Sequence, residues 1–182
     1  EAGASIGSMH PLVSVSDPAA GAESLASGYF CIEGDEKACV AAKELVDVLG
    51  GRSFKIAPDK KALYHAAAVM SAGHIAALFS ASVELLAECG VSTDEARKVL
   101  GPLVVSTAAN LEHYSPEDAL TGPFARGDRE TIEKNLHAIR SSAHPDLAEI
   151  YCLLGLRSLD LARKKGISEE DIQAITAILR SK

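Results

Sequence analysis

The sequence lacks the clustered basic residues that a nucleic-acid-binding surface needs. Its 182 residues include 18 lysines and arginines against 25 acidic residues, which gives a net charge of -7 at neutral pH. The basic residues are scattered along the chain, and the one run of three, Arg163 to Lys165, suits a helix C-terminus, where cations are favoured. The charge pattern therefore argues against nucleic acid as a partner.

Several motifs of catalysis and metal binding are also missing. There is no GxGxxG loop, P-loop or GxSxG elbow, so the chain carries no phosphate-cradling loop of its own. HExxH is absent, and no His, Cys and carboxylate cluster has zinc spacing, so no metal is predicted. The four cysteines form no CxxC pair, which indicates free thiols in a reducing, cytoplasmic compartment. The chain starts at Glu1, with its first methionine at position 9, which suggests a fragment or a processed product.

Charge is also missing from the 22 residues between Ala62 and Val83. The stretch is helical in character and long enough to span a bilayer. It contains two histidines and three serines, and about a third of it is alanine, which makes it a poor lipid-facing segment. We expect one long core helix covered on most sides, and a membrane helix remains the alternative.

Residues 1–57 read as an α/β segment. Short apolar runs predict strands over Ala4–Met9, Tyr29–Ile32 and Arg52–Ile56, and Gly34-Asp35 and Gly50-Gly51 bound a helix between the second and third. Strand, helix and strand with short joints form a βαβ unit. The predicted buried stripe of that helix consists of Ala38, Ala41, Leu45, Val48 and Leu49.

Residues 58–182 carry no further strand signal and predict about six helices. The boundaries of these helices are marked by a capping box at Ser92, a break or kink at Gly101-Pro102, and a loop over Thr121–Gly127. Further helix starts are expected at Ser115-Pro116, Asp128, Pro145 and Ser168. The predicted fold is mainly α with a small α/β part, divided into 1–57 and 58–182.

Lys61 and His65 give the strongest chemical indication. They are four residues apart and so share one helix face, which Ala68 and Ala72 continue with small side chains that leave room for a ligand. The pair predicts a general acid or charge stabiliser (Lys61) and its partner (His65). The alternative is a solvated lysine and a hydrogen-bonded core histidine. His74 lies on the opposite side of the helix and is assigned a structural role.

Two further segments could line a site. His10 is expected just beyond the first strand, where ligands bind in open α/β sheets, although an ordinary loop histidine explains it equally well. Ser14, Ser16 and Asp17 follow in a polar loop that could line the same cleft.

The other segment is the loop from Thr121 to Asp128. Arg126 could hold an anionic group through a bidentate contact or pair with a nearby acidic residue instead. Thr121 could contribute a hydroxyl or only cap the turn.

Three segments in order, HPLVSVSDP, KALYHAAAVMSAGHI and ALTGPFARGD, together resemble one family. It is a group of Rossmann-type, NADP-dependent oxidoreductase-like proteins whose helical second half is a domain of unknown function. The group is related to 6-phosphogluconate dehydrogenase, prephenate dehydrogenase and ketopantoate reductase. The resemblance covers nearly all of residues 5–140.

The resemblance implies a Rossmann domain that binds NADP or NAD, and a 6-phosphogluconate dehydrogenase C-terminal-like helical domain that closes the cleft and dimerises. Lys61 then corresponds to the lysine that polarises the substrate in the hydroxyacid dehydrogenases, and His65 replaces their asparagine. His10 is similar to the histidine of the His-Pro loop in prephenate dehydrogenase-like proteins. The first Rossmann strands would lie outside this chain, and the cofactor would bind there.

Two functions follow from these observations. The first is the substrate-binding and dimerisation part of an NAD(P)-dependent oxidoreductase-like protein, with Lys61, His65 and His10 as catalytic residues and Thr121, Arg126 and Ser14 as substrate contacts. The alternative is a non-catalytic dimerisation or ligand-sensing module of the same fold. A homodimer is expected under both, because the uncharged helix has more apolar surface than residues 1–57 can cover.

Overall fold

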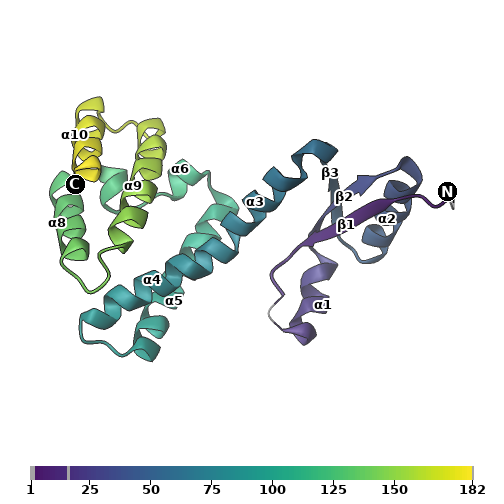
Figure 1. The fold of residues 1–182 in the computed structure, drawn as a ribbon, viewed down its shortest axis with the longest axis horizontal. Coiled ribbons are helices and arrows are strands. Elements are labelled where there is room, and N and C mark those ends of the chain that lie inside the picture. Colours follow the sequence, from purple (N-terminus) through teal and green to yellow (C-terminus); the bar gives the residue numbers. More distant parts are fainter. Residues whose placement is uncertain (1–2, 16, 182) are drawn as a thin grey trace. The chain divides into compact units, whose positions relative to one another are not determined.

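A computed structural model describes residues 3–15 and 17–181 (Figure 1). The chain divides into two compact units, Glu1–Ala76 and Ala77–Lys182. The predicted fold class, mainly α with a small α/β part, is confirmed. The division falls inside a helix rather than at residue 57, because the helix that follows the sheet packs on the sheet.

The first unit is built on a three-stranded sheet with β1 (Gly7–Leu12), β2 (Tyr29–Gly34) and β3 (Arg52–Lys55) in that order. Strands β2 and β3 are parallel and joined by helix α2 (Glu36–Val48), as the predicted βαβ unit requires. Strand β1 runs antiparallel to β2. A helix that the sequence analysis did not predict, α1 (Pro18–Ala26), joins β1 to β2.

Strand β2 is buried on both faces. Phe30 and Ile32 point to one face and Cys31 to the other, and all three are almost fully buried. Helix α2 covers the face of Phe30, where a side chain at Gly7 would place its Cβ 2.7 Å from the Ala38 Cβ. The opposite face meets helix α3 (Lys61–Ser71), which carries the candidate site.

The predicted buried stripe of α2 is wrong. Cys39 and Val46 are the buried residues of this helix, while Leu45, Val48 and Leu49 are exposed, Val48 to 86%. The sequence offers two apolar stripes about 100° apart on the helix. The stripe that packs contains Cys39 and Val46, and of the predicted stripe Ala38 is the residue that approaches Gly7.

The predicted long helix is interrupted. A 3₁₀ turn (Pro58–Lys60) leads into α3, and α4 (Gly73–Glu88) follows a break at Ala72, whose φ and ψ are -129° and -71°. Gly73 follows this break, and glycine in a helix is less favourable than other residues because it loses more conformational freedom.

The stretch from Pro58 to Glu88 is the one helical segment of the described residues that is long and apolar enough to cross a membrane, a test that core helices of soluble proteins also pass. Only 6% of its most apolar window is buried within the chain. The expectation that the chain itself covers this helix on most sides is therefore wrong.

The second unit contains helices α5 (Thr93–His113), α6 (Pro116–Ala119), α7 (Gly122–Arg126), α8 (Arg129–Arg140), α9 (Leu147–Lys164) and α10 (Glu169–Arg180). Its core has two clusters of apolar side chains on α8, α9 and α10, centred on Ile132 and Leu136. The helix starts predicted at Ser92, Ser115, Asp128 and Ser168 are confirmed, since each side chain accepts a hydrogen bond from the backbone three residues on.

The sequence predicts a kink or a break at Gly101-Pro102, and helix α5 is not broken there, because Gly101 has no Cβ to clash with the proline ring. Two other predictions for this part of the chain are wrong. The segment predicted as a loop from Thr121 contains the short helix α7, which ends at Gly127 with φ of 66°. Because of α7 and the division of the long helix, eight helices rather than six follow the sheet in the described residues.

Candidate functional site

The candidate site lies where one face of the sheet meets the first turns of α3. Side chains alternate along each strand, so the register places His10, Cys31 and Phe54 side by side on this face. Ser8 and Glu33 form the next row of the same face. Helix α3 contributes Lys61, Tyr64 and His65.

Lys61 is held by a charged hydrogen-bond network. Its Nζ forms an ion pair with the carboxylate of Glu33 and lies 3.3 Å from Ser8 Oγ, which donates to the same carboxylate at 3.0 Å. The hydrogen bonds from Lys61 and then Ser8 lower the pKa of Glu33. The Lys61 side chain is 45% exposed and that of Glu33 is 16% exposed, so the ammonium keeps access to solvent.

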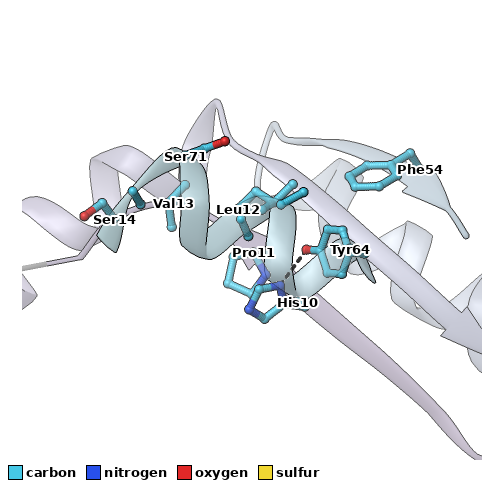
Figure 2. Close-up of a pocket in the computed structure, with 11 residues that line it drawn as sticks. His10, Pro11, Leu12, Val13, Ser14, Phe54, Tyr64 and Ser71 are labelled. Atoms are coloured by element: carbon cyan, nitrogen blue, oxygen red, sulfur yellow. Dashed lines mark hydrogen bonds between the residues drawn. The ribbon is translucent and has the colours of Figure 1, made fainter. Parts of the chain in front are cut away.

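His10 is held by Tyr64. The distance between His10 Nδ1 and Tyr64 Oη is 2.6 Å, and the two rings meet edge to face (Figure 2). Burial, followed by the effect of Cys31, raises the pKa of Tyr64. Burial and then the charge of Glu33 raise the pKa of Cys31, so both groups keep their protons at neutral pH.

His65 completes a cluster of rings. Its centroid lies 4.8 Å from that of His10 and 5.3 Å from that of Tyr64, and Phe54 lies 5.9 Å from Tyr64. The three residues predicted as catalytic, Lys61, His65 and His10, therefore lie on one surface of the first unit.

An open cleft of about 580 Å³ begins beside this cluster (Figure 2). Tyr64, Ala68, Ser71 and Ala72 line it from one face of α3, and the expected small side chains at positions 68 and 72 do leave space. Ser14 also lines the cleft, and its role as a substrate contact stays a prediction. The remaining lining residues are His10, Pro11, Leu12, Val13, Phe54 and Ala67.

The other predicted site residues lie elsewhere. Ser16 is outside the described residues, and Asp17 accepts the backbone N–H of Gly21 through its own carbonyl. Thr121 and Arg126 belong to the second unit, where they start and end α7. Their substrate-binding roles stay predictions.

Arg126 has an electrostatic effect on the residue that caps α8. Its charge helps to lower the pKa of Asp128, after the larger effects of two hydrogen bonds from Thr131. His74 is exposed in the first turn of α4, and its structural role also stays a prediction.

The position expected for His10 is wrong. It lies inside β1 and not beyond its end, because β1 continues through Pro11 to Leu12. Asp35 N donates to Ile6 O, so these two residues form a hydrogen-bonded pair of the β1–β2 ladder. Hydrogen-bonded and non-hydrogen-bonded pairs alternate along antiparallel strands, and Pro11 therefore belongs to a non-hydrogen-bonded pair, with Phe30. The missing N–H of Pro11 therefore costs the β1–β2 pairing no hydrogen bond.

The sequence analysis missed Tyr64, Glu33 and Cys31. Two signals could have found them. Glu33 is two residues after Cys31 in a buried strand, so both share the face opposite Phe30 and Ile32. Tyr64 is three residues after Lys61, and so on the same side of its helix.

Comparison with known proteins identifies the family. A model described as domain of unknown function DUF2520 matches residues 28–158, more than half of the chain. The chain belongs to this family. No curated protein matches the sequence.

Two solved structures are similar to the chain. Protein TM1727 from Thermotoga maritima matches with a TM-score of 0.76 and 26% identity over 87% of this chain and 62% of that one. The "putative NADP oxidoreductase BF3122" from Bacteroides fragilis matches with a TM-score of 0.61 and 23% identity over 75% of this chain and 51% of that one. The chain thus spans about half to three fifths of these proteins. The resemblance to a family with a domain of unknown function is confirmed, and the chain shares its fold with the protein described as a "putative NADP oxidoreductase".

The cleft beside Tyr64 does not fit a whole dinucleotide. Binding its pyrophosphate needs backbone N–H groups at a Gly-rich turn or cationic side chains. The cleft beside Tyr64 has neither an arginine nor a lysine in its lining.

Proposed function

We propose that this chain is the substrate-binding and dimerisation part of an NAD(P)-dependent oxidoreductase-like protein. The observation that carries the proposal is that the Tyr64–His10 pair lines an open cleft, while the Lys61–Glu33 pair lies on the same face of the sheet. Donors of this kind stabilise an oxygen that gains charge or a proton during reaction. The family, and the fold shared with a protein described as a "putative NADP oxidoreductase", support this reading.

The proposed roles follow from what each group can donate. Lys61, with three N–H donors, stabilises negative charge on a substrate oxygen, and Glu33 and Ser8 hold it in place. His10 and His65 supply imidazole groups beside it for proton transfer. The cofactor binds to a segment outside these 182 residues, and this chain alone is inactive.

Replacing Lys61 in the full-length parent protein tests the proposal. We expect Lys61→Ala to lower NADPH-dependent reduction of a panel of carbonyl compounds by about 100-fold or more, the usual range for loss of a proton-transfer group. The matched control is Lys60→Ala, which removes the neighbouring exposed lysine, paired with Asp59. Equal turnover of the Lys61 variant and the parent would contradict the role, and circular dichroism would confirm folding.

The ion pair between Lys61 and Glu33 favours a second function. The Lys61 ammonium is already paired with Glu33, and the resemblance places His65 where dehydrogenases have asparagine. Both fit a ligand-sensing or dimerisation module without hydride chemistry. Titration of the full-length parent with NADPH separates the two readings, since no binding at millimolar cofactor supports the module.

The homodimer is also part of the proposal. Helix α3 leaves Leu63, Val69 and Met70 exposed within the chain. A second copy of the chain would remove this apolar surface from water.

A further inference from the structure

Either Tyr64 or His10 could donate the hydrogen bond between them, and the protonation of the two groups decides which one does. A neutral imidazole has one protonated nitrogen and one bare nitrogen, and its partners select which is which. Burial raises the pKa of Tyr64, so its hydroxyl keeps its proton and is able to donate. A separation of 2.6 Å to His10 Nδ1 suits an O–H group donating to a bare nitrogen.

The second nitrogen of His10 is turned away from Tyr64 (Figure 2). Since His10 lines the cleft, a proton on Nε2 leaves this nitrogen able to donate to a molecule bound there.

We propose that Tyr64 is a positioning residue that holds His10 as the Nε2–H tautomer, so that the cleft presents a neutral N–H donor to a carbonyl or carboxylate oxygen of its ligand. The use of this donor in turnover rests on the proposed oxidoreductase function, but the tautomer itself does not.

The tautomer can be measured directly on the 182-residue chain. Nitrogen-15 labelling of histidine distinguishes the protonated from the bare ring nitrogen by NMR, and the variant His10→Gln assigns the signal. With the His10 ring neutral, we expect Nε2 protonated and Nδ1 bare with the shift of a hydrogen-bonded acceptor. A wild-type ring with its proton on Nδ1 would overturn the proposal.

Removing the hydroxyl provides the second measurement. We expect Tyr64→Phe to abolish the hydrogen-bond shift at Nδ1 and to let the other tautomer appear. The matched control Tyr29→Phe removes a hydroxyl from the same sheet, where it bonds Arg52, and should leave His10 unchanged. An unchanged His10 signal in Tyr64→Phe would also overturn the proposal.

These measurements need neither substrate nor cofactor. If Lys61→Ala keeps full turnover, the oxidoreductase function is excluded and the proposed tautomer of His10 is unaffected. If His10 instead carries its proton on Nδ1, the oxidoreductase function is unaffected and Tyr64 has a different role.

Discussion

At the scale of single residues, Glu33 connects the sheet to the first turn of α3. Its carboxylate accepts from Lys61 and Ser8, and its side chain is only 16% exposed. These two partners lower the pKa of Glu33 below its ordinary value of 4.5. A carboxyl group with a lowered pKa in the folded state stabilises that state above its ordinary pKa, and the contribution is lost as the pH falls through the lowered value.

We therefore expect Glu33→Gln to lower the thermal unfolding temperature at neutral pH, because Lys61 and Ser8 lose the carboxylate. The gap between the variant and the wild type should stay constant above pH 4.5 and narrow as the pH falls below it. Thermal unfolding followed by circular dichroism from neutral pH down to about pH 3 gives the measurement. Glu44→Gln, on the exposed side of α2, is the control and should show no such pH-dependent gap. A gap that is constant over the whole range would contradict the assignment.

At the scale of helices, α9 depends on a residue with poor helix propensity. A Cβ at Gly155 would lie 2.8 Å from Phe124 Cζ and 3.0 Å from Leu179 Cδ1. The glycine therefore lets α7 and α10 pack closely on α9. Intrinsic propensity favours alanine over glycine by about 1 kcal/mol, so packing has to outweigh it for the glycine to stabilise the fold.

We expect Gly155→Ala to destabilise the chain by about 1–2 kcal/mol net, because overpacking costs typically about 1–3 kcal/mol and the propensity gain offsets only part of it. Urea unfolding measures this change. Gly73→Ala is the matched control, since its added Cβ would be 3.9 Å from Val69 and in ordinary contact. Equal stability of the two variants would show that Phe124 and Leu179 move aside without cost.

At the scale of the whole molecule, the exposed apolar surface of α3 is the feature that needs an explanation. Met70 is 67% exposed on a helix that has few buried residues. Contiguous apolar surface of this kind marks a protein or membrane contact. If a second copy of the chain covers this surface, substitutions on it should change the oligomeric state, and substitutions elsewhere should not.

We expect Met70→Lys to convert a dimer into a monomer at micromolar concentration, because a lysine in an apolar interface loses hydration without gaining a partner. Light scattering coupled to gel filtration measures the mass. Val48→Lys changes an equally apolar, exposed residue on α2 and should leave the dimer intact. A wild-type monomer would contradict the dimer itself, and a dimeric Met70→Lys variant would exclude α3 as its interface.

The sequence alone determined the features that depend on near neighbours in the chain. The caps at Ser92, Ser115, Asp128 and Ser168 are local hydrogen bonds, and residues four apart share a helix face wherever the helix goes. The parallel β2–α2–β3 unit also follows from short-range signals and a general rule of chain connection. The pairing of Lys61 with His65 and the family resemblance rest on the same kind of local information.

Only the tertiary structure decided which partners these groups meet. The choice between the two stripes of α2 depends on how this helix packs on the sheet, and the position of His10 depends on an edge strand that tolerates Pro11. The contacts of Tyr64 with His10 and of Lys61 with Glu33 join residues 54 and 28 positions apart. Sequence patterns carry no register between such distant segments, because register is set by side chains packing on both faces of the sheet.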